Sequence, residues 1–164
     1  MHQYGENIYM HISSQDSKEY FPNNKLEHFH VKLDRPLNLQ GSWAVGLCEI
    51  HLSRRVVKKV KDLVVVDDGR GNDNDVADEP DIVNLRVECS LCMGLIVHGV
   101  QTRTLRTLTA KASLYKVFPI IYYFPVETRF IDTVEFRILN TSGELATFNE
   151  VGDRLEMVLH LKIC

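Results

Sequence analysis

The sequence has no apolar stretch long enough to cross a bilayer. Its longest apolar run is 117–126 (VFPIIYYFPV), which two prolines interrupt, whereas a helical span needs about 20 residues. The N-terminal stretch MHQYGENIYMHI also has neither the basic start nor the apolar core of a secretion signal. We therefore expect no membrane span, an intracellular chain before any assembly, and reduced thiols at Cys48, Cys89, Cys92 and Cys164.

The glycine patterns of common nucleotide and hydrolase sites are also missing. The sequence has no P-loop, no G-x-G-x-x-G and no G-x-S-x-G serine turn. The charge has little bias, since 19 basic against 22 acidic residues give a net charge of −3. Bulk charge therefore does not indicate a nucleic-acid-binding protein. We predict no catalytic and no cofactor-binding residues.

What the sequence does have is apolar residues that alternate with polar ones. A spacing of two places the apolar residues on one face of a strand, and that face is stable only when it is buried against another sheet. The alternating apolar sets are Ile8/Met10/Ile12, Phe29/Val31/Leu33, Leu85/Val87/Cys89/Leu91, Val134/Phe136/Ile138 and Leu155/Met157/Leu159/Leu161/Ile163.

The stretch 42–52 is apolar on both faces. Trp43, Val45 and Leu47 share one face, and Ala44, Cys48, Ile50 and Leu52 share the other. Both faces of this strand are therefore predicted to be covered. The second cover is either a neighbouring subunit or a long loop of the same chain, and the sequence leaves both open.

Turn-forming residues separate these runs at 22–24, 34–36, 140–143 and 152–153. Short strands divided in this way indicate an all-β protein, specifically a single jelly-roll β-sandwich of about eight antiparallel strands in two sheets. A length of 164 residues suits one domain over 1–164.

Two segments depart from the alternation and carry opposite charge. Residues 54–64 fit a short helix as well as a strand, and they carry a basic run at Arg54, Arg55, Lys58, Lys59 and Lys61. Residues 67–81 hold seven acids and one base, so we predict a flexible acidic surface loop there. The basic run allows contact with phosphates, but no aromatic residues flank it to read a nucleic-acid sequence.

Three patterns resemble metal sites but are incomplete. His28 and His30 face the same way on a strand, as in cupins, but the glycine before the pair and the glutamate after it are missing. Cys89 and Cys92 form a CxxC with no second ligand pair, and strand alternation would point them to opposite faces. The acidic loop lacks the central glycine of a calcium loop. We therefore predict no metal ligands.

An ordered set of short motifs resembles the minor capsid (penton) proteins of polinton (Maverick) elements and adintoviruses. The motifs are 20–24 (YFPNN), 29–33 (FHVKL), 36–39 (PLNL), 41–43 (GSW), 45–50 (VGLCEI), 85–92 (LRVECSLC), 124–126 (FPV), Phe130, 132–136 (DTVEF), 143–145 (GEL) and 155–162 (LEMVLHLK). The resemblance implies a single jelly roll, similar to the adenovirus penton base, that forms homopentamers at the five-fold vertices of an icosahedral virion. It also implies contact with a double jelly-roll major capsid protein and no enzymatic activity.

A pentameric ring needs a contact surface on each flank of the subunit. The candidate subunit-contact residues are Trp43, Val45, Leu47, Arg54, Arg55, Lys58, Lys59, Lys61, Phe118, Tyr122 and Tyr123. The oppositely charged segments 54–61 and 67–81 are predicted to pair between neighbours. The alternative functions are a β-sandwich binding module for a glycan or cell-surface receptor, and a cupin-like metalloprotein that uses His28 and His30.

Overall fold

A computed structural model describes residues 7–53, 83–97, 99–110, 114–148 and 154–164, which form strands and connecting turns without a helix. The strands are β1 (Asn7–Ser13), β2 (His28–Asn38), β3 (Trp43–Ser53), β4 (Val83–Cys89), β5 (Leu95–Val97), β6 (Val100–Thr102), β7 (Thr104–Ala110), β8 (Leu114–Val117), β9 (Phe124–Pro125), β10 (Phe130–Leu139) and β11 (Arg154–Ile163). The all-β prediction is confirmed.

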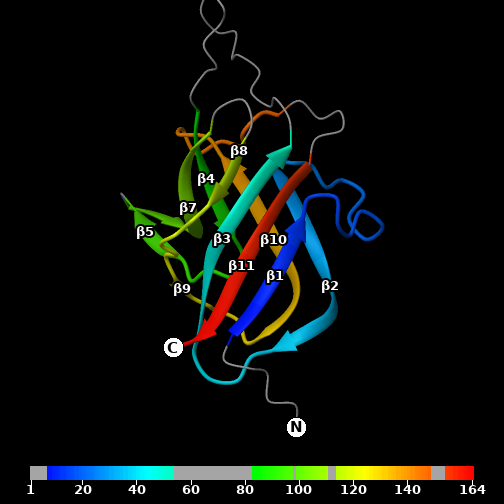
Figure 1. Ribbon diagram of the computed structural model, residues 1–164, viewed down its shortest axis with the longest axis vertical. Helices are drawn as coiled ribbons and strands as arrows, with labels where there is room; N and C mark the ends of the chain where they lie inside the picture. The colour runs from blue at the N-terminus through cyan, green and yellow to red at the C-terminus, as the bar shows by residue number, and fades with distance from the viewer. Residues whose placement is uncertain (1–6, 54–82, 98, 111–113, 149–153) are drawn as a thin grey trace, which may run out of the picture.

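Nine of these strands form two sheets that pack face to face (Figure 1). The first sheet has the order β1-β11-β3-β8, with β9 also paired to β3, and the second has the order β2-β10-β4-β7. Antiparallel pairing is nested along the chain: β1 with β11, β2 with β10, β3 with β8, and β4 with β7. This nesting, with successive strands crossing between two sheets, is the jelly-roll topology, so the predicted jelly roll is confirmed. The pair β5–β6 is a separate hairpin beside the sandwich.

The core lies between the two sheets and uses the alternation that the sequence predicts. Phe29 and Phe136 are fully buried from opposite strands of the second sheet, and their rings stack with centroids 5.2 Å apart. Leu159 and Leu161 bury the inner face of the first sheet. A stacked aromatic pair contributes about 0.5–1.5 kcal/mol beyond the free energy of burying its surface. The Phe29–Phe136 stack therefore helps to fix the register of β2 against β10.

The predicted turn at 34–36 is wrong, because Pro36 lies inside β2. β2 is an edge strand, and its register against β10 jumps from Lys32↔Thr133 to Leu37↔Ile131. The intervening residues form an irregular bulge in which no ladder hydrogen bond requires a proline N–H. Proline is tolerated in sheets at such edges and bulges.

Three sequence predictions lie outside the described residues. They are the helix-or-strand alternative at 54–64, the flexible acidic loop at 67–81 and the turn at 152–153. Within the described ranges, a search for helices that are long and apolar enough to span a membrane finds none.

Candidate interaction surfaces

The strand that is apolar on both faces owes this pattern to a β-bulge. Opposite β11, Glu49 pairs with Val158 and Leu47 with Leu159, so Cys48 is the extra residue. A bulge of one residue exchanges the faces of a strand. Inward-facing residues are therefore odd-numbered before Cys48 and even-numbered after it. The residues of this strand that join the core are Trp43, Val45, Leu47, Ile50 and Leu52.

Three of the candidate contact residues consequently lie in the core of the chain. Trp43, Val45 and Leu47 are at most 5% exposed, and the Trp43 indole N–H donates to the backbone oxygen of Gln40 at 2.8 Å. These side chains have almost no surface to offer a neighbour.

The outer face of β3 is covered by the chain's own segment 118–123. A Cβ atom placed on Gly46 would lie 2.4 Å from Cγ2 of Ile121 and 2.7 Å from the backbone oxygen of Tyr122. The segment connects β8 to β9, both of which pair with β3. The sequence left open whether a neighbouring subunit or a loop of the same chain covers the second face of this strand. The structure places a loop of the same chain there. Glycine at position 46 is what allows this close approach.

Arg106 of β7 holds this segment from the side of the second sheet. Its guanidinium lies 4.2 Å from the ring centroids of both Phe118 and Tyr122, and it donates to the backbone oxygen of Ile120 at 3.1 Å. Phe118 is buried beneath the guanidinium, whereas Tyr122 is 56% exposed. Of this aromatic pair, only Tyr122 offers a large surface for contact.

Tyr123 attaches the C-terminal end of segment 118–123 to the first sheet. Its hydroxyl is 2.7 Å from Nδ1 of His160, whose Nε2 is 2.9 Å from Oδ1 of Asn7. Tyr9 stacks on the same imidazole at 4.4 Å, and Nζ of Lys162 lies 3.9 Å from the Tyr123 ring centroid. Burial, and secondarily the charge of Lys162, lower the pKa of His160. Desolvation is also the main cause that raises the pKa of Tyr123.

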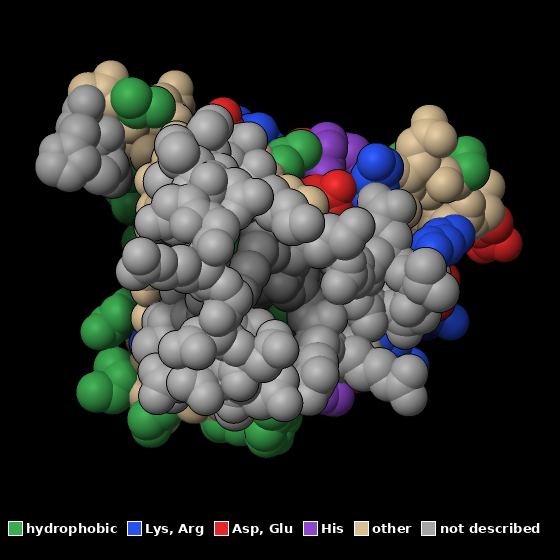
Figure 2. Space-filling view, turned by 90° about the horizontal axis from the view of Figure 1, so that it is seen from above, with side chains coloured by type: hydrophobic (Ala, Val, Ile, Leu, Met, Phe, Trp, Pro, Cys, Tyr) green, Lys and Arg blue, Asp and Glu red, His purple; other side chains and the backbone are tan. Residues whose placement is uncertain are grey.

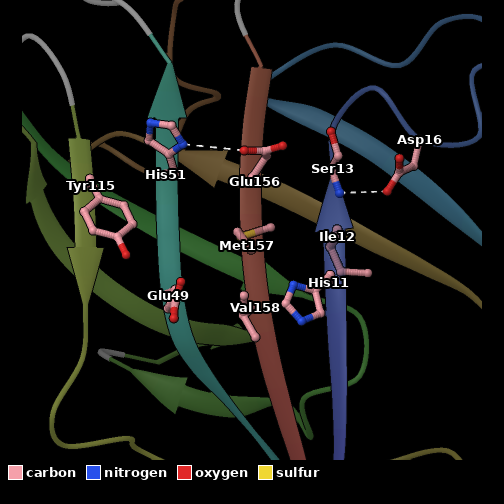
Figure 3. Close-up of a pocket in the computed structure, with 10 residues that line it drawn as sticks. All are labelled: His11, Ile12, Ser13, Asp16, Glu49, His51, Tyr115, Glu156, Met157 and Val158. Atoms are coloured by element: carbon pink, nitrogen blue, oxygen red, sulfur yellow. Dashed lines mark hydrogen bonds and ion pairs between the residues drawn. The ribbon is translucent and has the colours of Figure 1, made fainter.

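An open trough of about 440 Å³ crosses the outer face of the first sheet (Figure 3). Figure 3 shows His51 directed at Glu156, a contact of 3.5 Å, with Glu49 and Tyr115 along the same side. The Ser13 N–H donates to Oδ2 of Asp16 at 2.8 Å. The imidazoles and carboxylates in this trough are spread along β1, β3, β11 and the turn after β1, and they do not converge on a nucleophile.

The second sheet brings together three side chains of types that can ligate a metal ion, two of which the sequence singled out. His28 and His30 lie on β2, and Glu135 lies directly opposite His30 on β10. The sequence alone could not identify Glu135 as a partner of the two histidines, because Glu135 is more than 100 residues from His30 and only the β2–β10 register pairs them.

Cys89 and Cys92 do not point to opposite faces as alternation predicted. β4 ends at Cys89, and a turn with a 3.1 Å hydrogen bond from the Cys92 N–H to the Cys89 oxygen returns Cys92 to the core. Both residues are buried free thiols. A hydrogen bond with the Cys89 thiol, together with burial, raises the pKa of Cys92 far above its usual range. Such a thiol is a poor nucleophile.

The basic candidates Arg54, Arg55, Lys58, Lys59 and Lys61 lie outside the described residues. Exposed apolar side chains are concentrated elsewhere, on the β5–β6 hairpin and on β8. Figure 2 shows hydrophobic side chains standing out along the left side of the molecule, the side that carries β5 in Figure 1. Large exposed apolar residues in this region are Met93, Leu95, Ile96, Val100, Tyr115, Val117, Ile120 and Tyr122.

Comparison with known proteins supports the fold. No family model matches the sequence, and no curated protein matches it. Among solved structures, the chain is similar to the mavirus penton protein, with a TM-score of 0.60 and 7% identity over 95% of this chain and 99% of that one. The infectious bursal disease virus VP2 subviral particle also matches, with a TM-score of 0.27 and 11% identity over 97% of this chain and 33% of that chain. The predicted resemblance to penton proteins is thus confirmed for the fold.

Proposed function

We propose that the chain is a structural capsid protein of the penton type. The observation that carries this proposal is the nested jelly roll, which matches the mavirus penton protein over nearly the full length of both chains. In this role five copies form a ring at each five-fold vertex of an icosahedral virion. The ring contacts a double jelly-roll major capsid protein around it, and its role involves no catalytic step.

A closed ring of identical subunits is built from heterologous contacts, in which one flank meets the opposite flank of the next copy. The two sheets end in β8 and β7 on one flank and in β1 and β2 on the other (Figure 1). The flank of β7 and β8 therefore meets the flank of β1 and β2 of the neighbouring copy.

The β5–β6 hairpin supplies the apolar part of this contact. Ile96 and Val100 are 78% and 64% exposed, and on β8 Tyr115 and Val117 are 67% and 51% exposed. Contiguous exposed apolar patches are uncommon on monomers and mark interaction sites. Tyr122, which is 56% exposed, is the residue of the Phe118–Tyr122 pair that has surface to add to a contact. On the opposite flank, Tyr9 of β1 is 61% exposed and suits the core of an interface, where aromatic residues are enriched.

The proposal is tested by the mass and shape of the purified full-length chain. Native mass spectrometry should give five times the 18.9 kDa of one chain, and negative-stain electron microscopy should show rings of five. The double variant Ile96→Asp/Val100→Asp should dissociate the ring, because burying two unpaired carboxylates opposes association. Leu145→Asp, an exposed residue in the turn after β10, is the control and should leave the ring intact.

Two results would contradict the proposal. A wild-type chain that remains monomeric at concentrations of hundreds of micromolar contradicts the pentamer and favours the alternative of a binding module for a glycan or receptor. A pentamer that resists the hairpin variant but not the control contradicts the assignment of the flank.

A further inference from the structure

We propose that His28, His30 and Glu135 form a binding site for a divalent transition-metal ion such as Zn²⁺ on the outer face of the second sheet. This site is independent of the capsid role. It supersedes the expectation of no metal ligands, because the third ligand becomes visible only when β2 and β10 are paired.

The ligand atoms already converge. Nε2 of His28 and Nε2 of His30 lie 2.7 Å and 3.9 Å from the same oxygen, Oε1 of Glu135, and all three ligand groups are within 4.8 Å of one another. Around a tetrahedral Zn²⁺, bonds of about 2.0–2.2 Å place ligand atoms roughly 3.4 Å apart. The two observed distances bracket this value. Small side-chain rotations would therefore admit the ion.

The chemistry of the three groups suits a cation. Neutral imidazole nitrogens and a carboxylate oxygen can all donate a lone pair, and their convergence is favourable when a positive charge lies between them. Two imidazoles with one carboxylate form a known ligand set for zinc and for non-haem iron. The nearby charges are paired elsewhere: Arg137 with Glu88 at 3.8 Å, and Lys32 with Asp132 at 2.5 Å.

The backbone around the ligands is held firmly. The Asn24 side chain accepts from the His30 N–H at 2.9 Å and donates to the His30 oxygen at 2.7 Å. It therefore satisfies both backbone groups of His30 at the edge of β2. Ser90 does the same for Glu135, because its Oγ accepts from the Glu135 N–H and its N–H donates to the Glu135 oxygen, both at 2.9 Å. The Phe21 ring packs 5.2 Å from the His30 ring. Such supporting contacts orient ligands in metal sites.

The site also has an open side. The side chains of His28 and Glu135 are 39% exposed and that of His30 is 35% exposed. A hollow of about 230 Å³, bounded by Ser90, Arg103 and Arg137, adjoins Glu135. The fourth coordination position is therefore accessible to water. A bound ion would link edge strand β2 to β10 and should stabilise the folded chain.

The test is isothermal titration of the full-length protein with ZnCl₂ after treatment with a chelator. The wild-type chain should bind one Zn²⁺, and the melting temperature should rise by roughly 5–10 °C at a hundredfold excess over Kd. His28→Gln, His30→Gln and Glu135→Gln retain hydrogen-bonding groups of similar size and should each weaken Zn²⁺ binding at least tenfold. His51→Gln removes the imidazole of the His51–Glu156 pair on the other sheet and should bind like wild type.

Two outcomes would overturn the site. In the first, the wild-type chain binds no more Zn²⁺ than the triple variant His28→Gln/His30→Gln/Glu135→Gln. In the second, one Zn²⁺ binds with unchanged affinity in all three single variants, which would place the ion elsewhere, for example on the cysteines. Far-UV circular dichroism and urea unfolding show that each variant is folded, so a loss of binding reports on the ligands.

Discussion

Tyr123 and His160 are joined across the outer face of the first sheet by a hydrogen bond of 2.7 Å. With Asn7 accepting from Nε2 of the ring, Nδ1 is left to accept from the tyrosine hydroxyl, which requires the neutral imidazole. This pair attaches the segment 118–123 to β11, and it makes the attachment sensitive to protonation.

The free energy of unfolding should therefore fall in mild acid because of His160. An imidazole in the unfolded chain titrates near pH 6.5, whereas burial lowers the pKa of His160 in the folded chain. As the pH falls below about 6.5, the unfolded chain takes up this proton first, so stability is full above this pH and is lost on acidification. Urea unfolding between about pH 7.5 and 5 should show a smaller loss for His160→Gln than for wild type.

His51→Gln is the control for this measurement, since the His51 side chain is 45% exposed and lies on the same sheet face. It should not reduce the acid-induced loss. Equal pH dependence in wild type and His160→Gln would show that His160 does not couple protonation to folding.

Gly46→Ala should destabilise the chain by about 1–3 kcal/mol, which is the usual cost of overpacking. The new methyl group would lie 2.7 Å from a backbone oxygen, so the segment over β3 must shift. Gly94→Ala is the matched control, because there the nearest atoms belong to the flexible side chain of Gln101. In urea denaturation, the free energy of unfolding should be clearly lower for Gly46→Ala than for Gly94→Ala. The reverse order would argue against a close cover on β3.

Arg106→Ala should loosen the segment 118–122. The loss of two cation–π contacts, each about 0.5–1 kcal/mol, should lower the free energy of unfolding by about 1–2 kcal/mol. The hydrogen bond to the Ile120 oxygen is lost as well. Limited proteolysis should then cut the segment faster than in wild type. Arg103→Ala removes only an exposed ion pair with Glu127, and it should change stability by less than about 1 kcal/mol. Equal proteolysis of the two variants would contradict the role of Arg106.

Reversal of the basic run should impair assembly if it pairs with the acidic segment of a neighbour. The variant replaces Arg54, Arg55, Lys58, Lys59 and Lys61 with glutamate, which places like charges against 67–81. Pentamer yield in native mass spectrometry should drop, and a second variant that also reverses the acids of 67–81 should restore it. Unchanged assembly of the first variant would refute the pairing.

The sequence alone determined the architecture of the protein. Alternation with a period of two identified five strand faces, because a strand that buries one face must place apolar residues at every second position. It also explains why Phe29, Val87, Phe136 and Leu159 are all in the core.

Only the tertiary structure decided which residues that are far apart in the chain lie side by side. The bulge at Cys48, the loop over Gly46 and the pairing of His30 with Glu135 all depend on strand register and on which segments cross between sheets. Alternation is a local property and contains no register information. A single extra residue reverses the faces of a strand, and a glutamate that is unremarkable in sequence becomes a candidate ligand once it faces two histidines.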